Sequence, residues 1–457
     1  MRNKGEGVRG QGSGVEDESA LDSALATPNS GLFESIYEEV RAWCRARGYA
    51  GQDPFDALGS RIFQATALRR SRLARLAWTQ AFKRSPVNLR ALARVPAGRN
   101  PKGVALFALA ELSRLRATRG EKRERQTQEH EREARALLDD LLAARVRTRH
   151  GAAWGYNFDW QGRAFYAPRG TPAVVPTAFA VRALVEGSVA LGGAEYLDAA
   201  RAACEFILRD LNRADETDDE VCFSYTPLDR TRVFNASLLA AEALASVGAL
   251  TGEAELKALA LASARYVARR QREGGSWAYG ADSYQTWADN FHTAFVLTSL
   301  ARILRACGVE LERGAATREE ISGSLARGYE FWRSSFFLAD GWPKYYHHSA
   351  HPADAHSAGA AIVALAELAE SVFAQDEPVG AFGWPKEFAT DARTRAARVA
   401  RWAVRNLYDR RGFFYYQKRR LYTVRTPYMR WSQAWMMYAL ARLLEVGGKG
   451  KGEGGRG

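Results

Sequence analysis

The sequence reads TPAVVPTAFAVRALVEG at residues 171–187, and four further apolar segments of the same kind follow it. They are VFNASLLAAEALASV (233–247), DNFHTAFVLTSLARIL (289–304), DAHSAGAAIVALAEL (354–368) and YMRWSQAWMMYALARLL (428–444). A short aromatic stretch precedes each segment and ends in a tyrosine: Tyr156, Tyr225, Tyr279, Tyr345 and Tyr415. Successive tyrosines are 69, 54, 66 and 70 residues apart, which is too long for one helix of a solenoid but suits a helical hairpin with a long loop.

Amphipathic segments alternate with the apolar ones, at about 195–212, 253–272, 316–337 and 388–407. They carry charge on one face and Leu, Ala, Tyr or Trp on the other, which is typical of outer helices. Earlier in the chain, 100–112 predicts another inner helix with Pro101 in its first turn, 58–83 predicts a helix, and 119–135 predicts a solvated charged helix.

These segments together predict an all-α fold, an (α/α)6 toroid of six helical hairpins with short β-like aromatic stretches at the loop face. We expect a single domain over residues 31–445. The stretches 1–30 and 446–457 are rich in Gly, Ser and charge and are expected to be disordered tails.

The formal charge of +13 favours an anionic partner, although a base-composition effect on an arginine-rich chain explains it equally well. No array of basic and aromatic residues indicates nucleic-acid binding. The four cysteines, Cys44, Cys204, Cys222 and Cys307, form no CxxC pair and predict buried thiols in a reducing compartment. The first thirty residues lack a signal-peptide pattern and no run reaches eighteen apolar residues, so we expect a cytoplasmic protein without an integral membrane span.

In such a ring the loops before the inner helices open at one end, where helix N-termini present free N–H groups and partial positive charge. Polar and aromatic residues gather in those loops. Five of the seven histidines, His292, His347, His348, His351 and His356, lie in the third and fourth loops. His130 and His150 lie in solvated contexts and are given no role.

Two sugar chemistries fit these residues. Glycoside hydrolysis needs two carboxylates, for which Asp289 and Asp354 are the first candidates and Asp159 and Asp340 the substitutes; an Asp at a helix start is also an ordinary N-cap. Elimination or epimerisation at a uronic acid needs a base, an acid and a group that neutralises the carboxylate. Asn290, His292, His356, Tyr345 or Tyr346, and Arg430 supply those types.

Metal binding by HHSAH (347–351) with Asp354 and His356 matches no standard ligand spacing, so no metal is predicted, and no cofactor either. We predict Asp289, His292, Asp354 and His356 as catalytic residues. Predicted to bind substrate are the aromatic and polar residues of the loops and helix starts: Asn157, Asp159, Trp160, Arg163, Asn235, Tyr284, Trp287, Asn290, Lys344, Tyr345, Tyr346, Arg425, Tyr428, Arg430, Trp431 and Gln433. The expected partner is an oligo- or polysaccharide, anionic or lipid-linked; the oligomeric state stays open.

Several strings carry a resemblance: AWGYNFDWQGRAFYAPRGTP (153–172), FNASLL (234–239), DNFHTAF (289–295), PADAHSA (352–358), YMRWSQAW (428–435), NPKG (100–103) and KRSPVNLR (83–90). Over residues 35–445 the chain resembles an uncharacterised bacterial family whose genes lie among those for exopolysaccharide and cell-surface glycan synthesis. Some members carry the label delta-aminolevulinic acid dehydratase, which this sequence does not support, because such enzymes resemble metal- and lysine-dependent β/α barrels.

The hairpin ring is more distantly similar to six-hairpin glycosidases, polysaccharide lyases and epimerases, and to terpenoid cyclases. Gln271, Gly275 and Trp277 match one QxxxGxW repeat of squalene cyclases and protein prenyltransferases, but the DxDD motif that protonates an alkene is absent. The resemblance implies a carbohydrate-active protein of bacterial surface-polysaccharide synthesis, a hydrolase, lyase or epimerase. The alternatives are a non-catalytic glycan-binding or scaffold protein and, third, a terpenoid-cyclase-like enzyme.

Overall fold

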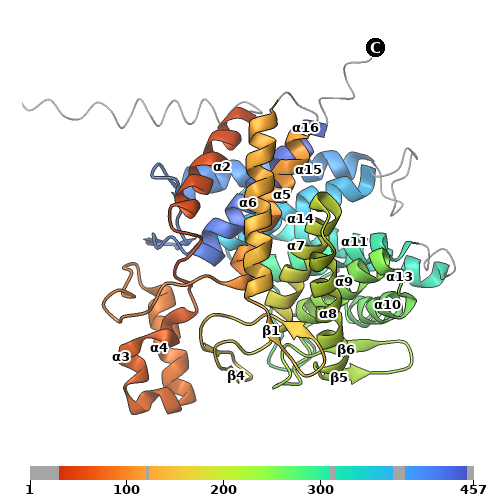
Figure 1. The fold of residues 1–457 in the computed structure, drawn as a ribbon, viewed down its shortest axis with the longest axis horizontal. Helices are drawn as coiled ribbons and strands as arrows, with labels where there is room; N and C mark the ends of the chain where they lie inside the picture. Colours follow the sequence, from red (N-terminus) through yellow and green to blue (C-terminus); the bar gives the residue numbers. More distant parts are fainter. Residues whose placement is uncertain (1–29, 120–122, 309–313, 374–385, 450–457) are drawn as a thin grey trace, which may run out of the picture.

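Six inner helices form a closed ring in the computed structural model, which describes residues 30–119, 123–308, 314–373 and 386–449 (Figure 1). They are α5 (Pro101–Thr118), α7 (Val174–Leu191), α9 (Phe234–Thr251), α11 (Asn290–Ala306), α14 (Ala355–Phe373) and α16 (Trp435–Lys449). Each inner helix contacts the next along the chain, and α16 contacts α5 to close the ring. The predicted (α/α)6 toroid is therefore confirmed.

Outer helices cover the ring, one against each inner helix. They are α2 (Ser30–Arg45), α6 (Glu124–Ala143), α8 (Ala194–Arg209), α10 (Ala254–Ala268), α13 (Ala315–Ser335) and α15 (Lys386–Leu407). Five of them pack on the inner helix that precedes them, whereas α2, the first described helix, packs on α16, the last. The two ends of the described chain thus form the sixth hairpin together.

The β-structure is confined to short ribbons at the end of the ring where the inner helices begin (Figure 1). Four antiparallel pairs are β1 (Val146–Arg147) with β2 (Ala152–Ala153), β3 (Trp160–Gln161) with β4 (Tyr166–Ala167), β5 (Arg213–Glu216) with β6 (Val221–Phe223), and β8 (Tyr408–Asp409) with β9 (Phe413–Phe414). A three-stranded sheet has the order β11 (Thr423–Val424), β10 (Gln417–Lys418), β7 (Ala353–Asp354). These ribbons hold the loops that form the mouth of the ring.

Residues 58–83 do not form the single helix that the sequence predicts. The chain instead makes η1 (Asp56–Gly59), α3 (Arg61–Gln64), η2 (Ala67–Arg70) and α4 (Arg72–Arg84), which project from the ring (Figure 1). Serine hydroxyls restart the helices: Ser60 Oγ accepts a hydrogen bond from Phe63 N (3.1 Å) and Ser71 Oγ accepts one from Ala74 N (3.3 Å). The segment 46–98, which we call the excursion, covers one side of the mouth.

Two further expectations need correction. Of the run 119–135, residues 124–135 belong to the outer helix α6 and 120–122 lie outside the described residues; His130 on α6 is buried rather than solvated, with Nδ1 2.7 Å from Glu111 Oε2. Helix α16 extends to Lys449, into the stretch expected to be a tail. The expected tail 1–30 lies outside the described residues except for Ser30, and so does 450–457.

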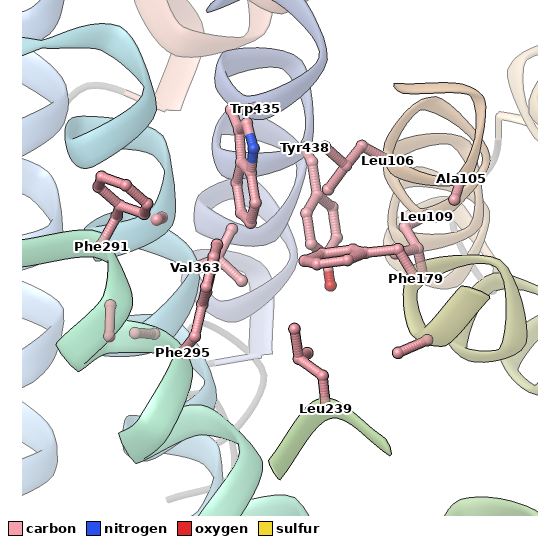
Figure 2. Close-up of a cluster of buried hydrophobic side chains, with 14 of the residues drawn as sticks. Ala105, Leu106, Leu109, Phe179, Leu239, Phe291, Phe295, Val363, Trp435 and Tyr438 are labelled. Atoms are coloured by element: carbon pink, nitrogen blue, oxygen red, sulfur yellow. The ribbon is translucent and has the colours of Figure 1, made fainter. Parts of the chain in front are cut away.

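Aromatic side chains from several inner helices meet in a buried cluster inside the ring (Figure 2). Phe179 of α7, Phe295 of α11 and Trp435 of α16 meet with ring centroids 5.4–5.9 Å apart, and Tyr438, Leu106 and Leu239 pack around them (Figure 2). We call these three rings the aromatic plug. Such pairs add about 0.5–1.5 kcal/mol each beyond the area they bury.

Two inner helices, α7 and α9, are long and apolar enough to cross a membrane. Of the residues in these apolar stretches, 67% in α7 and 78% in α9 are buried inside the protein. Apolarity on all sides is what a helix enclosed by neighbours requires.

Arginine–glutamate pairs connect all six inner helices in a closed chain, which we call the charge belt. Arg116 of α5 pairs with Glu186 of α7 (3.1 Å) and Glu445 of α16 (2.7 Å). Glu242 of α9 pairs with Arg182 of α7 and Arg302 of α11. Glu367 and Glu370 of α14 complete the belt through Arg302 and through Arg442 of α16. Most of these groups are buried, so each charge depends on its partners.

We expect Glu242→Gln to lower the free energy of unfolding by about 3–5 kcal/mol, because it leaves Arg182 and Arg302 buried without a full countercharge. Denaturant unfolding followed by circular dichroism measures this. The arginines hold the pKa of Glu242 below its ordinary 4.5, so its contribution is present above that pH and is lost as the pH falls through the lowered pKa. Glu205→Gln, which breaks surface pairs on α8, is the matched control and should cost about 0–1 kcal/mol. Equal losses in the two variants would contradict a structural role for the belt.

Candidate functional site

A cavity of about 300 Å³ opens at the end of the ring where the inner helices begin. The first turn of every inner helix, or the π-helical turn η3 (Met429–Ala434) that leads into α16, supplies a lining residue. These residues are Lys102, Val175, Asn235, His292, His356 and Arg430. The convergence of six helix starts follows from the ring, because all inner helices run in the same direction. Their N-terminal dipoles make this end favourable for negative charge.

His292 and Asp289 form a hydrogen-bonded pair at the start of α11. Asp289 is the N-cap: its Oδ1 accepts from His292 N (3.0 Å), and its Oδ2 lies 2.7 Å from His292 Nδ1 and accepts from Trp287 Nε1 (3.2 Å). Since a carboxylate only accepts, we assign the proton to Nδ1. Nε2 is then the basic nitrogen, and within the described chain it has no protein hydrogen-bond partner. The imidazole is 23% exposed and lines the cavity.

His356 is fully buried at the start of α14 and lines the same cavity. Neither of its ring nitrogens has a hydrogen-bond partner among the described residues. Its ring stacks on Trp431 with centroids 4.1 Å apart and meets the face of Phe291 at 4.4 Å. Burial, followed by the nearby Lys102 and Arg430 charges, lowers the pKa of His356 well below 6.5, so the imidazole is neutral at pH 7.

The two histidines both contact Phe291. The centroid of that ring is 4.0 Å from His292 and 4.4 Å from His356. The cavity therefore holds two imidazoles close together, one oriented by a carboxylate and one enclosed by aromatic rings. Groups of this kind accept and donate protons near neutral pH.

Carboxylates are scarce in the cavity. Of the described acidic residues only Asp289 lines it. Asp354 is fully buried, where Oδ1 accepts from Ser357 N (2.8 Å) as an N-cap and Oδ2 lies 3.4 Å from Trp431 Nε1. Burial raises its pKa. Asp340 caps a turn by accepting from Trp342 N and lies elsewhere. The predicted Asp289–Asp354 pair is thus a pair of N-caps rather than two carboxylates that face one another across the cavity.

Four cations line the cavity: Lys83, Lys102, Arg163 and Arg430. Arg430 is neutralised by a bidentate pair with Asp53 (2.6 and 2.7 Å). Lys102 instead places Nζ over the aromatic plug, 4.4 Å from Phe179, 5.0 Å from Phe295 and 5.3 Å from Trp435. No salt bridge joins it to a carboxylate of the described chain.

Burial lowers the pKa of Lys102 well below 10.5, and the nearby Arg430 and Arg182 lower it further. Burial also lowers the pKa of Lys83 to about 8. Neither ammonium group forms a salt bridge with a carboxylate of the described chain. A bound anion would therefore stabilise their charged forms.

Flat aromatic surfaces form the walls. Trp287 stacks on Tyr279 with centroids 4.6 Å apart at 14°, and Arg163 lies 4.7 Å above Trp287. Tyr156 and Tyr225 join their hydroxyls at 2.9 Å. Stacked rings beside hydroxyl groups suit the alternating apolar and polar faces of a sugar.

Nine of the predicted substrate-binding residues line this cavity: Trp160, Arg163, Asn235, Tyr284, Trp287, Tyr345, Tyr346, Arg430 and Trp431. Asn157 and Asp159 instead line a second cavity of about 220 Å³ between the excursion and the first loop.

The other predicted residues lie outside both cavities. Asn290 Nδ2 donates to Lys344 O, Lys344 Nζ donates to His347 O, and Tyr428 Oη accepts from Arg90. Gln433 pairs with the backbone of Phe414. Arg425 is exposed and lines a separate hollow. Their polar groups serve local structure.

Three kinds of cavity residue were not predicted from the sequence. Lys102 and Lys83 were not singled out, although both lie in quoted motifs. Phe55 comes from the excursion, which was not placed at the mouth. Tyr156, Tyr225 and Tyr279 line the cavity beside the predicted Tyr345, and the tyrosine repeat was the signal that could have found them.

No protein-family model matches the sequence, and no curated protein matches it significantly. Solved structures do match. The chain is similar to cellobiose 2-epimerase from Bacillus thermoamylovorans, with 13% identity, a TM-score of 0.54, and coverage of 77% of this chain and 88% of that one. It is also similar to a possible GH105 family member from Salmonella enterica, with 12% identity, a TM-score of 0.51, and 76% and 82% coverage.

A family 76 glycoside hydrolase from a bovine Bacteroides thetaiotaomicron strain gives 10% identity, a TM-score of 0.52, and 78% and 70% coverage. The chain has the toroid fold of these enzymes. At such low identity the likeness concerns the fold, and the chemistry has to be argued from the cavity.

We expect the His356 imidazole to remain neutral well below pH 6.5, because burial disfavours its charged form. Since the unfolded chain takes up this proton near pH 6.5, His356 lowers the stability of the fold as the pH falls below that value. Imidazole proton chemical shifts against pH, assigned with a His356→Phe variant, measure the titration. A titration of His356 near pH 6.5 in the folded protein would show that its ring reaches solvent or an acidic partner.

Proposed function

We propose that the protein is a carbohydrate-active enzyme that moves a proton at a carbon of an acidic sugar, by epimerisation or by β-elimination. The observation that carries this is the pair of cavity histidines that both contact Phe291, each with a ring nitrogen that no described residue occupies. The toroid neighbours, which include an epimerase and a glycoside hydrolase, support the carbohydrate class.

His292 would act as the base. Asp289 fixes its tautomer and orientation through Nδ1 at 2.7 Å, so Nε2 presents a lone pair to the cavity. A carboxylate behind a histidine also stabilises the imidazolium that forms when the ring takes up a proton. The proton would come from the carbon next to the carboxylate of a uronic acid.

His356 would handle the proton on the other side. Its ring contacts Trp431 and Phe291. In the reactive complex it would carry one extra proton, stabilised by the bound anionic sugar, and give it to the opposite face of the carbon or to the leaving oxygen. His292 takes up the proton removed from the carbon, so the pair begins and ends with one extra proton. Lys102, without a carboxylate partner in the described chain, would bind the substrate carboxylate and stabilise the negative charge that develops there.

The competing chemistries fit the cavity less well. A two-carboxylate glycosidase needs a second acid across the bond, and among the described lining residues Asp289 stands alone, held by three donors. A terpenoid-cyclase-like enzyme stabilises carbocations, which Arg163, a cationic lining residue without a salt bridge in the described chain, would repel.

The cellular setting that we propose is the synthesis of a bacterial surface polysaccharide, with a lipid-linked or polymeric substrate met in the cytoplasm. The family resemblance of the sequence supports this setting. A glycan-binding scaffold without turnover is the alternative that the following experiment distinguishes.

The purified protein should be incubated in D2O with uronic-acid and neutral oligosaccharides, and followed by NMR and by the absorbance of unsaturated uronates. Deuterium at the carbon beside the carboxylate, together with the epimer, indicates epimerisation, and unsaturated product indicates elimination. New reducing ends without either signal would indicate hydrolysis and refute the proposal. Binding without exchange or product would favour the scaffold.

His292→Gln and His356→Gln should each lower kcat by about 10²–10⁴-fold, the usual contribution of a general acid or base, while the melting temperature changes little. His150→Gln is the matched control, because His150 also holds Nδ1 against an aspartate, at 2.6 Å from Asp210, but lies away from the cavity. Full activity in a histidine variant of the cavity would remove that residue from the mechanism.

Lys102→Met should weaken the binding of a uronic-acid oligosaccharide by about tenfold or more, because a charged hydrogen bond is worth roughly 1.5–3 kcal/mol. Affinity for the matching neutral oligosaccharide should stay the same. Isothermal titration calorimetry measures both affinities. An equal loss of affinity for the two ligands would show that Lys102 shapes the cavity without binding the carboxylate.

A further inference from the structure

The excursion carries an unusual combination of charge and exposed apolar side chains. Residues 57–110 contain no Asp or Glu, and nine Lys and Arg lie between 61 and 94: Arg61, Arg69, Arg70, Arg72, Arg75, Lys83, Arg84, Arg90 and Arg94. Within the described chain only Arg90 of these forms a salt bridge, with Asp56. The other eight form no salt bridge within the described chain, so most of the positive charge of this segment lacks a paired carboxylate.

Large apolar side chains gather on the same segment. Leu73 and Leu92 are each 78% exposed, and Ile62, Leu68, Val87 and Leu89 are exposed as well. The tip of the β10–β11 hairpin adds Leu421, which is 90% exposed beside Arg420. Tyr422 Oη donates to Arg84 O at 2.9 Å and so fixes this tip to the end of α4. Exposed apolar residues that cluster in this way mark an interaction surface.

This surface adjoins the cavity. Leu76, Gln80 and Lys83 of α4 line the cavity, and their spacing of four and three residues places them on one face of the helix. Leu73 lies three residues before Leu76, on the same face, at the exposed start of α4. Leu73 and Leu76 thus connect the cavity wall with the exposed start of α4. In Figure 1 α3 and α4 project at the end of the ring where β4, β5 and β6 lie.

We propose that the excursion and the 419–422 tip form a docking surface for an anionic lipid bilayer. Arginines supply attraction to acidic headgroups, and exposed leucines between them insert below the headgroups, the combination that peripheral membrane proteins use. A soluble polyanion would account for the arginines, but it offers no apolar phase for Leu68, Leu73, Leu92 and Leu421. The surface lies outside the histidine pair, so this proposal does not depend on the proposed reaction.

The test is co-sedimentation of the full-length protein with vesicles of phosphatidylcholine, with or without phosphatidylglycerol. We expect binding to the anionic vesicles, at least tenfold weaker binding to the neutral ones, and a fall in binding as salt is added. Failure to bind anionic vesicles in preference to neutral ones would overturn the proposal.

The triple variant Leu68→Ser/Leu73→Ser/Leu92→Ser should lower the vesicle partition coefficient at least tenfold. Its matched control is Val189→Ser/Leu228→Ser/Leu250→Ser, which changes three exposed aliphatic residues elsewhere on the protein and should bind as the unchanged protein does. These positions are exposed, so both proteins should keep their circular dichroism spectra. An equal loss in the two triples would overturn the proposal.

The triple variant Arg69→Gln/Arg70→Gln/Arg420→Gln should lose both the preference for anionic vesicles and the salt dependence. Arg145→Gln/Arg149→Gln/Arg209→Gln, on exposed positions away from the excursion, should lose neither. Binding of a soluble polyuronate through Arg69, Arg70 and Arg420 without vesicle binding would replace the bilayer by a polyanion as the partner.

Discussion

The closure of the ring depends on buried charges that only neighbouring inner helices can neutralise. Glu242 and Glu367 each receive arginines from two helices, and Arg116 connects the first inner helix to the last. A helix that shifted by one turn would leave a buried arginine or glutamate unpaired, at a cost of several kcal/mol. Apolar packing alone would fix the register of the helices less strictly, because alanine-rich faces such as those of α9 and α14 pack in more than one way. The belt therefore selects one register around the ring.

Fixing the inner helices at the belt also fixes their starts, and the cavity is built from those starts. His292, His356 and Lys102 stand in the first turns of three helices, so their relative positions follow from the ring rather than from the loops. The aromatic plug packs beside them inside the ring. Rigid supports and apolar surroundings are what a proton-transfer site needs to hold imidazoles in place beside an amine whose pKa is lowered.

The sequence was sufficient for the architecture, because hydrophobic period and spacing report directly on helices that are buried or half-buried. It was insufficient for 58–83, where Ser60 and Ser71 cap new helices at positions that a periodicity argument passes over. Asp289 and Asp354 show the limit for the site, since an N-cap and a catalytic acid have the same sequence pattern and only burial and partners separate them. The QxxxGxW string has a structural role: Gln271 donates to Gly275 O and Ser324 O, and Trp277 donates to Val267 O. Lys102 could not be recognised because its neighbours come from three other helices.

The pairing of α2 with α16 has a consequence for how the protein is made. As the ribosome releases the chain from its N-terminus, α2 emerges long before the helix against which it packs. The cavity is also completed late, because Asp53 near the start of the described chain binds Arg430 near its end. Until α16 has been synthesised, a growing chain exposes the apolar sides of α5 and α14 that α16 will cover. Closure of the ring, and with it completion of the cavity, is therefore a late event in the synthesis of these six hairpins.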